Sequence, residues 1–166
     1  MQSKKGFTLV ELLVVIAIIG ILSSIAVVSV GNVRRLARDS KRLADIRQLQ
    51  TALEMYFNEN NAYPLAAGIT NPATPITLGD AANVALCNDA GYRGFNTIAG
   101  CGATTMYLSK VSANPVPGGA SYVYTPADAD AGNNNRPTTY TVTFSLESAM
   151  AGYAVGAHQL SQFGMR

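Results

Sequence analysis

The sequence predicts an α+β protein in which one long N-terminal helix carries a small antiparallel sheet on its second half. The first observation is an uncharged run from Leu12 to Val33, which exceeds the roughly 20 residues that a helix needs to cross a membrane. The second is a stripe of apolar residues at helical spacing between Leu43 and Phe57. The third is the alternation of apolar and polar residues from Tyr140 to Leu146, which is typical of a strand with one buried face.

The apolar segment from Phe7 to Val33 is predicted to be a retained membrane anchor. Lys4 and Lys5 precede it, as basic residues precede the core of a secretory signal peptide. The run is longer than the roughly 7–15 residues of such a core, and no clear cleavage site ends it near Ala26. We therefore expect the segment to be kept, with the lysines on the cytoplasmic side and the rest of the chain outside.

One acid, Glu11, lies near the start of this apolar segment. A carboxylate buried in a membrane costs about 2.5 kcal/mol or more, so a plain anchor has no use for it. Two interpretations are open. Glu11 lies hydrated at the headgroup edge, or it pairs with a cation at the same depth on a neighbouring subunit. A buried ion pair of this kind sets register rather than adding stability.

The sequence KGFTLVE at residues 5–11, followed by the apolar run, resembles the N-terminus of type IV pilins and type II secretion pseudopilins. The resemblance is close over residues 4–64. It implies the pilin fold, cleavage between Gly6 and Phe7 by a prepilin peptidase, and methylation of the new Phe7 amine by the same enzyme. It also gives Glu11 a role in assembly and subunit docking. The implied partners are further copies of the chain in a filament, an inner-membrane assembly platform and membrane lipid.

Two features depart from the family's pattern. Many members have proline where this chain has Val28, and local unwinding of the helix at that point accompanies assembly. Gly20 and Gly31 are the weak points that remain here. In addition, Cys87 and Cys101 do not lie at the chain end, so the C-terminal disulfide loop of adhesive pilins is not evident.

Residues 34–58 are predicted to continue the helix into water, giving a helix of about 50 residues and roughly 75 Å. Asp39 and Arg42 are three positions apart and can pair on one helix face. A stripe of six apolar residues is suited to packing on a sheet: Leu43, Ile46, Leu49, Leu53, Tyr56 and Phe57. Five basic residues form either a solvated collar outside the membrane or a surface for acidic patches on neighbouring subunits: Arg34, Arg35, Arg38, Lys41 and Arg42.

The helix is expected to end between Asn58 and Tyr63, because asparagines and Pro64 are stop signals. Its exit, ALEMYF at residues 52–57 before NAYP, resembles that of the major pseudopilin. The predicted organisation is therefore a leader at 1–6, a membrane and filament-core helix at 7–33, an amphipathic helix at 34–63 and a globular region at 64–166.

The stretch from Leu65 to Val116 is predicted to be an ordered, loop-rich connection. Residues 80–86 are expected to form a short helix capped by Asp80, and residues 104–111 either a short helix or a strand. In an exported domain, Cys87 and Cys101 predict a disulfide that stabilises the fold by about 3 kcal/mol. The alternative is two buried free thiols.

Three strands are predicted in the remainder of the chain, at residues 121–125, 138–146 and 152–156. Between the first two, Asp128 and Asp130 alternate and Asn133 to Asn135 follow, and oxygen ligands of this kind suit calcium. Some major pseudopilins hold calcium in a C-terminal loop. The spacing here is not that of an EF-hand, and the same composition fits an ordinary hairpin loop. No other cofactor is expected.

Composition and charge argue against catalysis and against binding of nucleic acid. The formal net charge of +2 comes from Lys4 and Lys5, because the twelve basic residues without these two equal the ten acidic ones. The basic residues of the helix have no interleaved aromatic residues that would support DNA contact. His158 is the one histidine, and no Ser-His-Asp set, metal-ligand cluster or phosphate loop accompanies it. We therefore do not expect an enzyme.

The expected function is that of a pilin, a structural filament subunit drawn from an inner-membrane pool and ending in a surface filament. One alternative is the major pseudopilin of a type II secretion system, which acts in a periplasmic pseudopilus as a secretion piston. The helix exit favours this alternative, whereas Cys87, Cys101 and the Ala/Thr/Asn-rich loops favour a pilin. A minor pilin for DNA uptake is disfavoured by the balanced charge, and a monomeric membrane-anchored domain is the remaining alternative.

Overall fold

The computed structural model describes residues 6–66, 74–89, 93–102, 105–130 and 136–166. The chain divides into two units, Met1–Ala37 and Arg38–Arg166. The helix α1 (Leu9–Asn60) is 52 residues long and contributes to both units. The architecture is α+β, as predicted, and the helix is close to the expected length.

In the first unit, α1 exposes apolar side chains on every side. Leu12, Ile16 and Ile21 are each more than half exposed. The stretch is long and apolar enough to cross a membrane. Gly20, Val28 and Gly31 all lie within the regular helix. An apolar surface of this kind needs lipid or other helices around it, because water would otherwise cover it.

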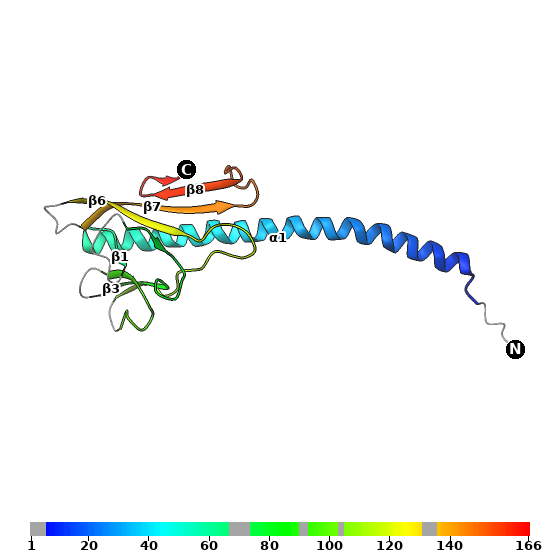
Figure 1. Cartoon of the computed structure of the whole chain (residues 1–166), viewed down its shortest axis with the longest axis horizontal. Coiled ribbons are helices and arrows are strands. Elements are labelled where there is room, and N and C mark those ends of the chain that lie inside the picture. Colours follow the sequence, from blue (N-terminus) through cyan, green and yellow to red (C-terminus); the bar gives the residue numbers. More distant parts are fainter. Residues whose placement is uncertain (1–5, 67–73, 90–92, 103–104, 131–135) are drawn as a thin grey trace. The chain divides into compact units, whose positions relative to one another are not determined.

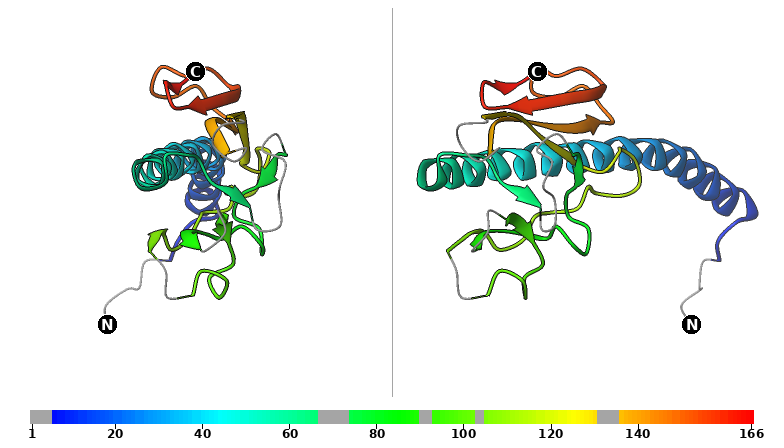
Figure 2. Two further views of the ribbon diagram at one scale, coloured as in Figure 1. Left: turned by 90° about the vertical axis from the view of Figure 1, so that its left-hand side faces the viewer. Right: turned by 60° about the vertical axis from the view of Figure 1, so that its left-hand side comes forward.

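The core of the second unit is built on the predicted helix stripe. Figure 1 shows this part of α1 beside two sheets, and Figure 2 shows the same arrangement from two further directions. The buried cluster joins the helix to Val142 and Leu160 of one sheet and to Leu86 and Phe95 of the other. The helix contributes the partly buried Phe57 and six buried residues: Leu43, Ile46, Leu49, Ala52, Leu53 and Tyr56.

The larger sheet is antiparallel and has the strand order β2-β6-β7-β8-β9. Its second and third strands, β6 (Val123–Asp130) and β7 (Arg136–Leu146), confirm two of the predicted strands and extend them. In β7, Tyr140 to Leu146 alternate between buried and half-buried residues, as the sequence pattern predicts. The remaining strands are β2 (Ile76–Thr77), β8 (Gly156–Ser161) and β9 (Gly164–Met165).

The predicted strand at residues 152–156 is wrong. Met150 and Tyr153 exchange backbone hydrogen bonds of 3.0 Å and 2.9 Å across a tight turn. Ala151 and Gly152 have positive φ angles of 53° and 88° in that turn, which suits the two central residues of a type I′ turn. The strand begins only at Gly156, and its apolar inner residue is Leu160.

The smaller sheet occupies the stretch that was predicted to be loop-rich. Its strand order is β1-β4-β3-β5, with β1 (Leu65–Ala66), β3 (Ala85–Asp89), β4 (Arg93–Asn96) and β5 (Met106–Leu108). The predicted disulfide is confirmed, because the Sγ atoms of Cys87 and Cys101 are bonded at 2.11 Å and both residues are buried. For residues 104–111 the sequence left helix and strand open, and the structure has a strand at Met106–Leu108.

The predicted short helix at residues 80–86 is also wrong. The Asp80 carboxylate accepts hydrogen bonds from the backbone N–H groups of Ala82 and Asn83, at 3.0 Å and 2.7 Å, and from the Asn83 amide. These bonds stabilise a turn that leads directly into β3. Aspartate supports such turns as readily as it caps helices, so the bonds of Asp80 to the following residues form without a helix behind them.

The helix stripe provides a test of the fold. Replacing the fully buried Leu53 by alanine should lower the free energy of unfolding by about 2–5 kcal/mol, because it removes transfer energy and leaves a cavity. The Met55→Ala variant is the control, because Met55 lies on the same helix and is 52% exposed. Urea denaturation of both variants measures the difference, and equal stabilities would contradict the packing described here.

Candidate functional site

The predicted cleavage site lies in the chain just before the helix begins. Gly6, Phe7 and Thr8 precede α1, and all three are exposed. Phe7 is 89% exposed. A Cβ atom placed on Gly6 would have no described atom within 4 Å, apart from those of its chain neighbours. A peptide bond in such an irregular, exposed segment can enter a protease active site. Lys4 and Lys5 lie outside the described residues.

Glu11 forms a capping box with Thr8 at the start of α1. Its Oε2 atom accepts hydrogen bonds from the backbone N–H and the hydroxyl of Thr8, each at 2.8 Å. The Thr8 Oγ1 atom accepts a bond of 3.2 Å from the backbone N–H of Glu11. Two N–H groups that the helix leaves unpaired are thereby satisfied. The pattern Thr-x-x-Glu predicts this arrangement. The two sequence interpretations, hydration at the headgroup edge and a partner in another subunit, did not include it.

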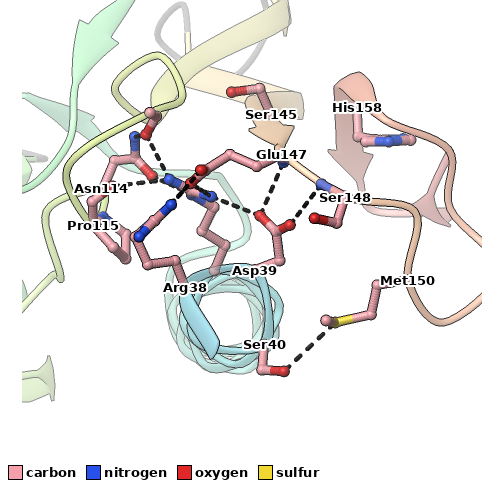
Figure 3. Close-up of polar contacts among 12 residues, drawn as sticks. Arg38, Asp39, Ser40, Asn114, Pro115, Ser145, Glu147, Ser148, Met150 and His158 are labelled. Atoms are coloured by element: carbon pink, nitrogen blue, oxygen red, sulfur yellow. Dashed lines mark hydrogen bonds and ion pairs between the residues drawn. The ribbon is translucent and has the colours of Figure 1, made fainter. Parts of the chain in front are cut away.

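A second polar site lies where the second unit begins. We call it the Arg42 cluster, and it consists of Arg38, Asp39, Arg42, Asn114 and Glu147. Figure 3 shows its side chains converging from α1, from the loop before β6 and from the end of β7. Arg42 and Asp39 are fully buried. A buried ion pair is tolerated only when further hydrogen bonds satisfy its remaining polar atoms.

The Arg42 guanidinium makes five hydrogen bonds. Its Nη1 atom donates to Asp39 Oδ1 and Glu147 Oε1, each at 2.6 Å. Its Nε atom donates to Asn114 Oδ1 at 2.7 Å, and Nη2 donates to the carbonyls of Pro115 and Gly118. These acceptors come from three separate segments of the chain. Arg42 therefore joins the helix, the loop and the sheet at one point.

The two carboxylates of the cluster complete the network. Asp39 accepts bonds from the backbone N–H groups of Glu147 and Ser148, at 3.0 Å and 2.8 Å. Glu147 accepts two bonds from Arg38, from Nε at 2.8 Å and from Nη2 at 2.5 Å. These bonds from Arg38 lower the pKa of Glu147 from 4.5 to about 2, and Arg42 adds to the effect while partial burial opposes it.

The cluster confirms one prediction about the helix and corrects another. Asp39 and Arg42 pair at three positions' separation, as expected. The interpretation of all five basic residues as a free collar or a surface for neighbouring subunits is wrong for Arg38 and Arg42, since both form ion pairs with Glu147. No local pattern in the sequence links residues 38 and 42 to Glu147, which is more than 100 positions away.

The other candidate residues are placed as follows. The ring of His158 lies near those of Phe144 and Tyr153, at centroid distances of 5.6 Å and 5.4 Å. The side chains of Asp128 and Asp130, and all of residues 133–135, lie outside the described residues, so calcium binding there stays a prediction. Within the described part of the chain, no three His, Cys, Asp or Glu side chains are grouped as metal ligands would be.

The described chain combines two features. The first is an exposed apolar helix with a capped acid at its third position, and the second is an α+β domain that includes the later part of the same helix. The N-terminal segment matches the family model described as the prokaryotic N-terminal methylation motif, over residues 1–27. The chain therefore carries a prokaryotic N-terminal methylation motif at the start of its apolar helix.

Curated relatives agree with this assignment. The chain is 43% identical over 79 residues to the type II secretion system core protein G of Klebsiella michiganensis. The matched region is 45% of this chain and 56% of that protein. The corresponding protein of Vibrio cholerae is 39% identical over 80 residues, with coverages of 45% and 55%. The type IV wide pilus major component PilA4 of Thermus thermophilus is 39% identical over 79 residues, with coverages of 48% and 56%.

The chain thus spans about half the length of the curated relatives it matches. No solved structure matches the chain at a comparable level of significance.

The lowered pKa of Glu147 predicts how stability depends on pH. A carboxyl whose pKa is lower in the folded state contributes stability above its unfolded value of 4.5 and loses that contribution as pH falls toward about 2. The free energy of unfolding, measured by urea denaturation, should therefore decrease between about pH 5 and pH 2. Glu147→Gln should be less stable at pH 6 and should show a shallower decrease.

Glu59→Gln is the control for loss of one carboxylate elsewhere on the helix. It should retain the steep decrease, because Arg38 and Arg42 still hold Glu147 in that variant. An unchanged decrease in Glu147→Gln would show that the cluster does not control the acid response.

Proposed function

We propose that this protein is a structural subunit of a type IV pilus-like filament. The observation that carries the proposal is the N-terminal methylation motif on an apolar helix whose side chains have no cover from the rest of the described chain. Such a helix can lie in lipid as a monomer and in a bundle of sister helices as a polymer. The role is structural and needs no catalytic group.

The proposed assembly begins with processing. A prepilin peptidase cuts between Gly6 and Phe7 and methylates the new amine of Phe7. The subunits wait in the inner membrane, with the C-terminal domain outside the cytoplasm, and an assembly platform in that membrane extracts them. The exposed position of Phe7 supports the accessibility of the bond. Membrane lipid and further copies of the chain are the other proposed partners.

Glu11 is proposed to set the register between subunits. Both of its bonds to Thr8 use Oε2. Among the described residues no donor bonds to Oε1, so this atom can accept a bond from another subunit. The amine of Phe7 on a neighbouring subunit would be a cation of suitable depth. The capping box holds the carboxylate in place before that partner arrives, which reduces the side-chain entropy lost on docking.

A second candidate function is that of a type II secretion pseudopilin, which forms a short periplasmic filament. The identity of 43% to core protein G of Klebsiella michiganensis favours it. The identity of 39% to the pilus component PilA4 favours the first candidate. Electron microscopy of cells separates the two, because long surface fibres made of this chain are expected only for a pilin.

The first test is the mass of the mature N-terminus. We expect mass spectrometry of the protein purified from membranes to show a chain that begins at Phe7 and carries one methyl group on its amine. An intact Met1, or a cut near Ala26, would contradict the proposed processing. A Gly6→Leu variant should keep its leader, because a bulky side chain at the cut site hinders access to the peptide bond.

The second test separates the charge of Glu11 from its capping function. Glu11→Gln keeps the capping box, since glutamine also serves at that position, but it loses the charge. Thr8→Ala loses the box and keeps the charge. If docking depends on the ion pair, Glu11→Gln should abolish filaments seen by electron microscopy, whereas Thr8→Ala should reduce them less.

Circular dichroism of both variants checks that the helix is retained. Normal filaments from a processed Glu11→Gln subunit would show that the carboxylate charge is not needed for assembly.

A further inference from the structure

On the outer face of the larger sheet, the described side chains of β6, β7 and β8 carry no charge. Register pairs such as Thr125 with Thr141, and Thr141 with Ser161, place these residues opposite the buried face that holds Val142 and Leu160. Solvent-facing strands usually carry charged residues, because charge keeps a sheet face soluble. In β6, β7 and β8, the described residues on this face are small or hydroxyl- and amide-bearing: Val123, Thr125, Ala127, Thr139, Thr141, Thr143, Ser145, Ala157, Gln159 and Ser161.

One end of this face is hollowed. The hollow has a volume of about 320 Å³, at the lower end of the range for small-molecule sites. Gln159 belongs to it, and the backbone of Gln159 pairs with Arg166 through hydrogen bonds of 3.1 Å and 2.8 Å. The lining includes hydroxyl, amide, aromatic and guanidinium groups from Thr139, Thr141, Gln159, Gln162, Phe163 and Arg166. Among the residues whose side chains are described, no carboxylate side chain lines the hollow.

Phe163 stands at the rim of the hollow and is 81% exposed. It is presented by an ordered turn between β8 and β9. The Phe163 N–H donates to Ser161 Oγ at 3.3 Å, that hydroxyl donates to the Gly164 carbonyl at 3.4 Å, and Gly164 has a φ of 108°. Single exposed apolar residues are common on protein surfaces. Phe163 lies beside a polar hollow, and these hydrogen bonds order the backbone of its turn.

We propose that the hollow binds a pyranose ring of an oligosaccharide. The ring of Phe163 would pack on the apolar C–H face of the sugar, where weak C–H contacts add to burial. The amides of Gln159 and Gln162 and the hydroxyl of Thr141 offer donors and acceptors to the sugar hydroxyls. The Arg166 guanidinium adds donors at one side.

Other ligand classes fit the hollow less well. A nucleic acid needs several cations along its backbone, and one guanidinium lines the hollow. A divalent cation needs carboxylate oxygens, and the lining has none on its side chains. The site goes beyond the proposed filament function and does not depend on it, since all of its residues belong to one copy of the chain.

The test uses the full chain in lauryldimethylamine oxide, a detergent without a sugar headgroup. The probes are maltotriose, cellotriose and triacetylchitotriose, followed by saturation-transfer NMR. We expect at least one trisaccharide to give a saturable signal with an affinity on the order of millimolar. Phe163→Ala should weaken that affinity about tenfold, and Phe163→Trp should restore it.

Val155→Ala is the matched control, because Val155 is an apolar residue of the same unit, 62% exposed and outside the hollow. It should leave the affinity unchanged. The proposal is overturned if no trisaccharide gives a saturable signal, or if Phe163→Ala binds as well as the parent. It is equally overturned if Phe163→Ala binds the trisaccharide as before but no longer assembles into filaments, because the face is then a contact between copies of the chain. The mass of the mature N-terminus tests the filament function separately.

Discussion

The second unit depends on one buried cation that cannot be left unpaired. The guanidinium of Arg42 is removed from water, and that removal is tolerated because acceptors from the helix, the loop at Asn114 to Gly118 and the end of β7 surround it. Hydrophobic burial along the helix stripe is non-directional and would allow the sheet to shift. The directed bonds of Arg42 and Asp39 fix where the sheet meets the helix, so the register of the whole domain follows from them.

At the N-terminal end of α1, a second charged side chain, that of Glu11, lies among apolar residues. A carboxylate near the start of an apolar helix requires donors, and Glu11 finds them in Thr8. This local solution lowers the difficulty of holding the acid in a membrane while leaving one carboxylate oxygen available. The capping box is therefore compatible with the proposed pairing of Glu11 with a neighbouring subunit. A hydrated acid with no fixed geometry would give a docking partner less to recognise.

The sequence predicts the elements with strong periodicity and fails where long-range pairing decides. The stripe from Leu43 to Phe57 and the alternation in β7 each report one buried face, and both were identified correctly. The smaller sheet was missed because its strands are short, and β1 pairs in parallel with β4, which lies beyond β3 in the chain. The capping box was predictable from Thr-x-x-Glu. The contact between Arg42 and Glu147 was not, because only the folded chain brings the two together.

The Arg42 cluster also changes how the charge of the helix is understood. Five basic residues between Arg34 and Arg42 suggest a strongly positive band just beyond the apolar segment. Two of the five are neutralised by Asp39 and Glu147 within the same unit, so their field falls off as that of an ion pair rather than of free charges. Arg34, Arg35 and Lys41 are the exposed members, and none of them has an ion pair among the described residues. The helix therefore exposes three cations in this stretch rather than the five that the sequence alone suggests.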